Sequence, residues 1–258
     1  MDLGIKGRKA ILCASSKGLG KACAQSLARE GVAVWINGRN EGPLAEAAAE
    51  IRAAGGTVTT VKADINTDAG RNALLAACPE PDILVNNNEG PPPGKLADWD
   101  HDAWIGALEA NMLPAILLIR AVLPGMQARK FGRVVNITSA MVKAPRSHMG
   151  LSTAARAGLT AFCKSQVSVV APDNVTINNL LPERIDTGRQ QFMAERMMKA
   201  DGITREEARK RIASTIAAKR MGLPEEFGDA CAYVCSAQAG FMSGQNLQLD
   251  GGSYEGLI

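Results

Sequence analysis

Short apolar runs alternate with stretches of helical periodicity along the whole chain, and this alternation constrains the fold more than any other feature. Helical patterns fill the segments between the apolar runs. Because strands that alternate with helices form right-handed crossovers, we expect a doubly wound α/β fold. It would contain a parallel sheet of about seven strands with helices on both faces. The runs with the length and composition of buried strands are 9–14, 32–36, 58–63, 83–85, 133–137, 175–180 and 246–249.

One domain, spanning residues 1–258, is the simplest interpretation of the chain. Hydrophobic residues make up 46% of it, which is enough for one large core, and no linker, repeat or low-complexity segment divides it. The stretch from Arg189 to Lys219 is rich in Met, Arg and Ala. Its composition predicts an inserted pair of helices.

The charge pattern argues against a nucleic-acid or membrane partner. The formal net charge is +3, and the 29 basic residues are scattered along the chain. The first residues are too polar for a signal peptide, and no apolar run approaches the roughly 18 residues of a membrane span. We therefore expect a cytoplasmic protein that acts on a small molecule.

The cysteines are predicted to be reduced, buried packing residues. They show neither a CxxC pair nor the Cys/His spacing of a metal site, so no metal is expected. The six cysteines are Cys13, Cys23, Cys78, Cys163, Cys231 and Cys235.

A glycine-containing turn lies between the first predicted strand and the first predicted helix. Its sequence is Cys13-Ala14-Ser15-Ser16-Lys17-Gly18-Leu19-Gly20. Glycines at such a turn let the backbone approach a pyrophosphate, which the positive end of the helix then holds. A Rossmann-like dinucleotide site is one interpretation of this turn. A tight turn that merely needs positive φ is the other.

The turn resembles the TGxxxGxG motif of the short-chain dehydrogenase/reductase family, with Cys13 and Ala14 in place of its Thr and first Gly. The resemblance, which is to the 3-oxoacyl-acyl-carrier-protein reductase type, continues in register over nearly the whole chain. The matching segments are Ala63-Asp64-Ile65, Asn86-Asn87-Asn88-Glu89 (NNAG in the family), Asn111, Ser139, Pro182-Glu183 with Thr187, Gly244 and Asp250-Gly251-Gly252. It implies a nicotinamide dinucleotide cofactor.

The end of the second predicted strand indicates which dinucleotide is bound. An acidic residue there would favour NAD, but the chain has Gly38 and Arg39, and Lys17 adds a second cation. Two cations without a carboxylate suit a 2′-phosphate, so we expect NADP(H). The predicted cofactor-binding residues are Ser15, Ser16, Lys17, Gly18, Leu19, Gly20, Arg39, Asp64, Ile65, Asn87, Pro182 and Thr187.

The catalytic tyrosine of the family has no counterpart in this register. The family's YxxxK pair begins thirteen residues after the serine, which here gives Ser152 and Arg156. The chain's two tyrosines are Tyr233 and Tyr254. An aliphatic hydroxyl is a far weaker acid than a phenol, whose pKa is about 10. Arg156 stays protonated and cannot relay a proton, whereas histidine is the side chain that ordinarily titrates near neutral pH, so His148 is a candidate donor.

Two carboxylates complete the set of candidate residues. Glu89 and Glu183 stand where the family has glycines beside the cofactor, so they either crowd the nicotinamide or supply new acid/base groups. The resemblance also implies that residues of about 188–219 form a helical substrate lid. The candidate catalytic residues are Ser139, Ser152, Arg156, Asn111, His148 and Glu183.

Three functions stay open at this point. The first is an NADP(H)-dependent oxidoreductase acting on a carbonyl or alcohol of a small, partly apolar substrate. The second is a nucleotide-binding protein without redox turnover, and the third is a dehydratase, isomerase or hydrolase built on the remodelled site. Family members pair their two long helices, here 104–129 and 154–170, so we expect a homotetramer or homodimer.

Overall fold

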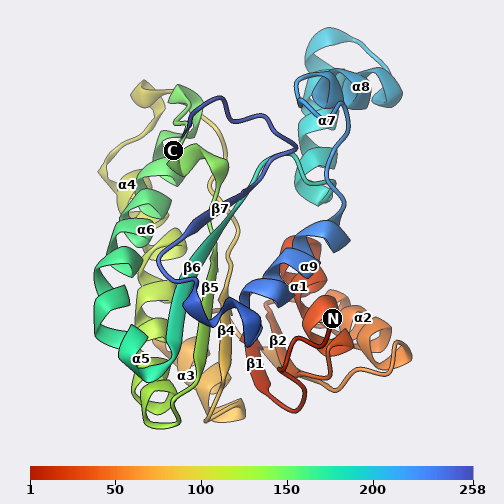
Figure 1. Ribbon diagram of the computed structural model, residues 1–258. Coiled ribbons are helices and arrows are strands. Elements are labelled where there is room, and N and C mark those ends of the chain that lie inside the picture. Colours follow the sequence, from red (N-terminus) through yellow and green to blue (C-terminus); the bar gives the residue numbers. More distant parts are fainter. Residues whose placement is uncertain (258) are drawn as a thin grey trace.

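The computed structural model describes residues 1–257 and confirms the predicted fold. Seven strands form one sheet in the order β3-β2-β1-β4-β5-β6-β7, and every neighbouring pair is parallel (Figure 1). The strands are β1 Lys9–Leu12, β2 Ala33–Gly38, β3 Val58–Lys62, β4 Ile83–Asn86, β5 Gly132–Ile137, β6 Val175–Pro182 and β7 Asn246–Leu249.

Helices cover both faces of the sheet, and the alternation of side chains along each strand supplies both cores. In β1, Ala10 and Leu12 pack under α1, α2 and α9, whereas Ile11 faces α5 and α6. Figure 1 shows these two groups of helices on opposite sides of the sheet. The helices are α1 Gly18–Arg29, α2 Glu41–Ala53, α3 Asp68–Ala77, α4 His101–Asn111, α5 Leu113–Ala128, α6 Gly150–Val170, α7 Gly188–Asp201, α8 Arg205–Ser214 and α9 Pro224–Val234.

The strand order reverses between β1 and β4. From β1 the chain adds β2 and β3 in one direction, and from β4 it adds β5, β6 and β7 in the other. The loops that follow β1 and β4 therefore leave toward opposite faces of the sheet and open a crevice at its carboxyl edge. This crevice is the position at which open α/β sheets bind their ligands.

The stretch 101–128 corrects two expectations. Residues 104–129 were predicted as one long helix, but the structure divides the stretch into α4 and α5 at Met112, just before Pro114. By length and composition, residues 101–128 are also apolar enough to cross a membrane, although no such run was expected from the sequence. Glu109 and Arg120 interrupt the apolar residues, so the segment is recognised only by its mean hydropathy. In the structure α4 and α5 pack on α6.

The predicted helical pair in 188–219 is present as α7 and α8. It stands apart from the main body and has a small core of its own (Figure 1). Ala194, Ala208 and Ile212 form that core, and Met193 and Met197 pack against it. These methionines are therefore packing residues of the helical pair.

All six cysteines are buried and unbridged. Burial raises the pKa of Cys13 and of Cys163 to about 12, so both stay as thiols at neutral pH. Within residues 1–257, no group of three or more His, Cys, Asp or Glu side chains is placed to hold a metal ion.

A chain of asparagine side chains joins the last four strands. Asn86, Asn136, Asn179 and Asn246 stand in register on β4, β5, β6 and β7. Successive amide groups are hydrogen-bonded, at 2.9 Å from Asn86 to Asn136, 3.0 Å from Asn136 to Asn179 and 2.8 Å from Asn179 to Asn246. Because Asn86, Asn136 and Asn179 are buried, each depends on its neighbour for its hydrogen bonds. The chain fixes strand register next to the crevice.

The central member of this chain provides a test of the fold. Asn136→Ala leaves the Asn86 amide donor and the Asn179 amide oxygen without partners, and each unsatisfied buried group costs about 1–3 kcal/mol. We expect a loss of about 2–5 kcal/mol in the free energy of unfolding, measured by urea denaturation. Asn40→Ala, at an exposed position without a side-chain hydrogen bond in the N-cap of α2, is the control. An equal effect of both variants would contradict the role of the chain.

Candidate active site and cofactor cleft

The turn after β1 has the backbone geometry of a phosphate-binding loop. Gly18 has φ +59° and begins α1, so its positive φ suits glycine. A Cβ at Gly20 would lie 2.6 Å from the Ala14 carbonyl oxygen, which only glycine avoids. Ala14 itself has φ +43°, a conformation that strains a residue with a Cβ. The turn thus keeps its shape although alanine replaces the family's first glycine.

Ser15 has a structural role in this turn, which its prediction as a cofactor ligand did not foresee. The side chain is fully buried, donates to the Leu12 carbonyl oxygen at 2.7 Å and accepts from the Asn37 backbone N–H at 2.9 Å. Its own N–H donates to the Asn37 carbonyl at 2.8 Å. Both polar groups of Ser15 are therefore used to join the ends of β1 and β2. Ser16, Lys17 and Leu19 are less buried and border the crevice.

Arg39 follows β2 and points along the crevice toward Glu89. Its Nη2 lies 2.9 Å from a Glu89 carboxylate oxygen, and 79% of the Glu89 side chain is exposed. Glu89 therefore pairs with Arg39, and both line a cavity that also extends to Asn111 and Leu151. A pair this exposed is weak, so a phosphate can replace the carboxylate on Arg39.

The segments after β3 and β4 build the opposite wall of the crevice. The Asp64 carboxylate accepts from the Asn66 backbone N–H at 3.0 Å, which shapes the loop after β3. Ile65 is buried with its side chain at the edge of a small cavity. Asn87 donates to the Ala14 carbonyl oxygen at 3.1 Å, so the β4 loop holds the phosphate-binding turn in place.

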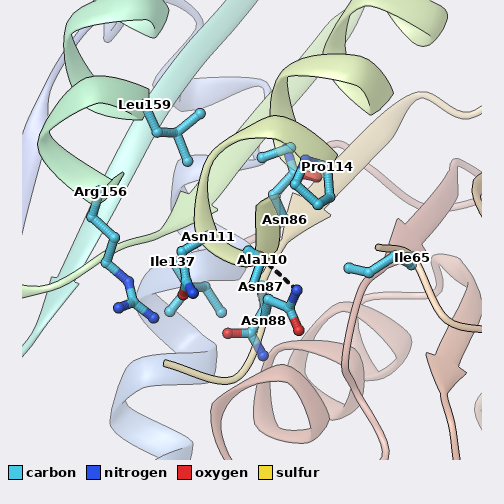
Figure 2. A pocket seen from close by; sticks show the side chains of 11 residues that line it. Ile65, Asn86, Asn87, Asn88, Ala110, Asn111, Pro114, Ile137, Arg156 and Leu159 are labelled. Carbon is cyan, nitrogen blue, oxygen red and sulfur yellow. Dashed lines mark hydrogen bonds between the residues drawn. The ribbon is translucent and has the colours of Figure 1, made fainter. Parts of the chain in front are cut away.

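Arg156 and Asn111 line the same small cavity (Figure 2), and Ser152 is hydrogen-bonded to Arg156. The helix α6 begins at Gly150, earlier than the predicted residue 154, so Ser152 and Arg156 stand on its first two turns. Arg156 Nη1 donates to the Ser152 hydroxyl. A cavity of about 20 Å³ separates Arg156 from Asn111, whose buried Oδ1 has no hydrogen-bond partner in residues 1–257.

The charge on Arg156 persists at neutral pH in this environment. Burial, and secondly the charge of Arg189, lower the pKa of Arg156 to about 10. Its guanidinium is also close to the β4 loop, because a Cβ at Gly90 would lie 3.1 Å from Nη1. Arg156 is therefore a fixed cation that donates hydrogen bonds.

Ser139 and His148 come from the loops that precede α6. Ser139 follows β5, and its hydroxyl accepts from the Met141 backbone N–H at 3.2 Å. His148 is exposed, and its carbonyl oxygen accepts from the Gly94 N–H at 3.0 Å. The imidazole therefore borders solvent at the rim of the cleft.

Glu183 is held by two arginines at the end of β6. Its side chain is only 8% exposed, and its carboxylate lies 3.3 Å from both Arg146 Nη2 and Arg184 Nε. The carboxylate charge is thus already compensated. Pro182 is the last residue of β6. Thr187 is the N-cap residue of α7, and its methyl group lies 3.9 Å from the position that a Cβ on Gly18 would occupy.

Trp99 anchors the proline-rich loop to the start of α6. Its indole fills the space that side chains on Gly94 and Gly150 would need, since a Cβ would approach the ring to 2.7 Å and 2.5 Å. It also packs edge-on against Trp104, with ring centroids 5.8 Å apart. A cavity of about 590 Å³ lies between this loop and α4, lined in part by Pro91–Pro93, Trp99 and Leu151. The proline, tryptophan and leucine side chains form the apolar part of the wall of this cavity.

Sequence analysis missed several residues of the cleft. Asn37 was not singled out, although its amide joins the loops of β1 and β3, and Arg146 was not paired with Glu183. Arg189 offered one signal in the sequence: it follows Thr187 closely, in the first turn of a helix, where a cation is unfavourable. Such a residue calls for an anion nearby.

These residues fit a dinucleotide with a 2′-phosphate. The glycine turn leaves room for a pyrophosphate at the start of α1, and Arg39 after β2 can bind a phosphate in place of the Glu89 carboxylate. The unpartnered Asn111 oxygen, Arg156 and Ser152 provide polar groups for the nicotinamide half.

Comparisons with known proteins agree with this geometry. The family described as enoyl-(acyl carrier protein) reductase matches residues 13–254. The chain is 31% identical over 258 residues to the uncharacterized oxidoreductase YvaG of Bacillus subtilis, covering 98% of each. It is 29% identical to the NADPH-dependent reductase BacG of the same organism, covering 97% of this chain and 99% of the relative.

A solved structure extends the similarity to three dimensions. L-sorbose reductase from Gluconobacter frateurii, complexed with NADPH and L-sorbose, superposes with a TM-score of 0.94 at 28% identity, and all of each chain is covered. The sheet order, the crevice at the switch point and the nearly full-length family match lead to one conclusion: this chain belongs to the short-chain dehydrogenase/reductase family.

Proposed function

We propose that the protein is an NADP(H)-dependent oxidoreductase that interconverts a carbonyl and an alcohol on a small molecule. The observation that carries this function is the cleft itself. The glycine turn and Arg39 lie at one end of it, and the hydroxyl of Ser152 with Arg156 lies at the other. This arrangement suits a dinucleotide that runs from a 2′-phosphate to a reactive ring.

The proposed chemistry assigns each side chain at the nicotinamide end a role. When bound, NADPH supplies a hydride for the carbonyl carbon. Ser139 and Ser152 donate hydrogen bonds to the carbonyl oxygen and polarise the bond. Arg156 takes the place of the family's lysine: it holds Ser152 by a hydrogen bond and offers its other N–H groups to the nicotinamide ribose. Asn111 faces Arg156 across the small cavity and orients polar groups there.

The proton for the product alcohol comes from solvent or from His148 in this proposal. His148 lies at the exposed rim of the cleft, in the loop that leads into α6. Glu183 is less suited to the role, because its carboxylate is already engaged by two guanidinium groups. The helices α7 and α8 would form the substrate lid, and we place the enzyme in the cytoplasm.

A protein that binds the nucleotide without redox turnover is the second candidate. The observation that favours it is Ser152, because no tyrosine within residues 1–257 lies on the first turns of α6. The non-redox alternative has less support, since both of its proposed carboxylates, Glu89 and Glu183, are ion-paired. Activity measurements separate the first two candidates.

Cofactor preference tests the role of Arg39. A guanidinium that binds the 2′-phosphate should make NADPH bind at least tenfold more tightly than NADH, about 1.4 kcal/mol, as measured by fluorescence titration. Arg39→Asp should reverse that order, because a carboxylate repels the phosphate and accepts bonds from ribose hydroxyls. Arg205→Asp, the same change in charge at the start of α8, should leave the preference unaltered. Equal affinities in the unmodified protein would refute the assignment.

Restoring the family's pair tests the proposed catalytic site. Ser152→Tyr with Arg156→Lys adds a phenol and a lysine that lowers its pKa. Turnover of an activated ketone with NADPH should rise by a sizeable part of the roughly 10²–10⁴-fold that a positioned acid contributes. Ser152→Tyr alone should gain less, because arginine does not reproduce the lysine geometry. A double variant that binds NADPH but stays inert would favour the second candidate.

The apolar surface of the long helices predicts self-association. Only 28% of the apolar window in the α4–α5 stretch is buried within one chain, and Ile105 and Leu113 are each 40% exposed. On α6, Val169 is 60% exposed. We expect a homotetramer, or a homodimer, that buries these faces, with Leu113→Lys lowering the mass measured by light scattering. A monomeric mass of the unmodified protein at micromolar concentration would rule this out.

A further inference from the structure

The cavity of about 590 Å³ between the proline-rich loop and α4 has two chemically different ends. Its volume is within the range of about 300–1,000 Å³ that is typical of small-molecule sites. Arg39 and Glu89 line one end, where the 2′-phosphate of the proposed cofactor would bind. The other end is apolar and reaches Leu151, the residue that precedes Ser152 on the first turn of α6. The proposed chemistry does not use this apolar end.

Helix α4 keeps the apolar end of the cavity open. The residues that line the cavity from this helix are small and recur on one helix face: Ala103, Gly106, Ala107 and Ala110. A Cβ on Gly106 would meet no heavy atom within 4 Å, so a larger side chain would fit at this position. Glycine inside a helix is less stable than alanine. The chain therefore gives up helix stability at a position where it leaves space unfilled.

The wall opposite α4 is fixed to the start of α6. The Trp99 indole lies so close to the loop and to α6 that a Cβ on Gly94 or on Gly150 would approach it to 2.7 Å or 2.5 Å. The Gly94 N–H also donates to the His148 carbonyl oxygen at 3.0 Å. These contacts hold both sides of the cavity apart, so the space is preformed. A preformed site binds a ligand with a smaller cost of ordering the protein.

This cavity meets the small cavity beside Arg156. Asn88, Ala110 and Asn111 line both cavities. Gly90 also lines the larger one, and a Cβ on it would lie 3.1 Å from Arg156 Nη1. Asn111 is buried, and its Oδ1 has no hydrogen-bond partner among residues 1–257. Because buried polar atoms are normally hydrogen-bonded, this oxygen marks the junction of the two cavities as a place where a bound molecule completes the contacts.

We propose that the apolar end of the cavity binds the apolar part of the substrate, and that the substrate is a ketone with one large apolar substituent or the secondary alcohol formed from it. This proposal rests on the proposed function and adds the substrate class. The carbonyl would lie at Ser152, and the substituent would pass Leu151 into the space between Trp99 and α4. Removal of its apolar surface from water would supply the binding energy.

A series of methyl ketones that differ only in alkyl length tests the proposal. Each methylene that becomes buried raises kcat/KM with NADPH by up to about fourfold, so methyl hexyl ketone should exceed methyl ethyl ketone by about tenfold or more. Ala103→Leu should lower this ratio by about fivefold or more, because the added carbons exclude those of the substrate. Gly106→Leu is a second cavity-filling variant and should act in the same way. Ala76→Leu is the matched control, at an exposed position of α3 outside both cavities.

The outcomes separate this proposal from the proposed function. Equal kcat/KM along the series, or a ratio that neither cavity-filling variant changes, would overturn the substrate class while leaving the oxidoreductase intact. If Ala103→Leu weakens NADPH binding by the same factor, the cavity belongs to the cofactor and the proposal fails. If no ketone is turned over, the proposed reaction fails, and calorimetric titration of the two ketones into the NADP⁺ complex decides the substrate class. Tighter binding of the hexyl ketone that Ala103→Leu abolishes would support the apolar site, and equal binding would overturn it.

Discussion

The strands β4, β5, β6 and β7 are joined by the chain of amides from Asn86 to Asn246. Each amide is hydrogen-bonded to its neighbour, and Asn86, Asn136 and Asn179 are buried, so a slip of one strand would leave several polar groups unpaired. The residues that follow these strands are thereby held in fixed positions. The walls of the cleft, including the Asn87 loop, Ser139 and Glu183, all emerge from strands tied in this way.

A second set of polar contacts plays the same part on the other side of the switch point. Asn37 at the end of β2 accepts from the Ala14 N–H and donates to the carbonyl oxygens of Val61 and Ala63. Ser15 adds its bonds to β1 and β2. These hydrogen bonds of Asn37 and Ser15 hold the phosphate-binding turn in position, which explains how the turn tolerates Ala14 at positive φ.

The cleft is divided by charge as well as by shape. At the adenosine end, Arg39 is neutralised by an exposed carboxylate that a phosphate can replace. At the nicotinamide end, the Glu183 carboxylate is shared by Arg146 and Arg184, whereas Arg156 donates to the Ser152 hydroxyl. The two ends of the cleft therefore differ in which charged groups are already paired.

The sequence by itself determined which segments form the strands and helices, and how the motifs are spaced along the chain. The alternating apolar runs, the glycine turn and the spacing from Ser139 to Ser152 are local patterns. Such patterns can be recognised without knowing any tertiary contact. What only the tertiary structure decided was the partner of each charged or polar side chain. Glu89 meets Arg39 fifty residues away, and Glu183 meets Arg146 from another loop. Such partners depend on how loops converge at the edge of the sheet, and no spacing along the chain encodes that convergence.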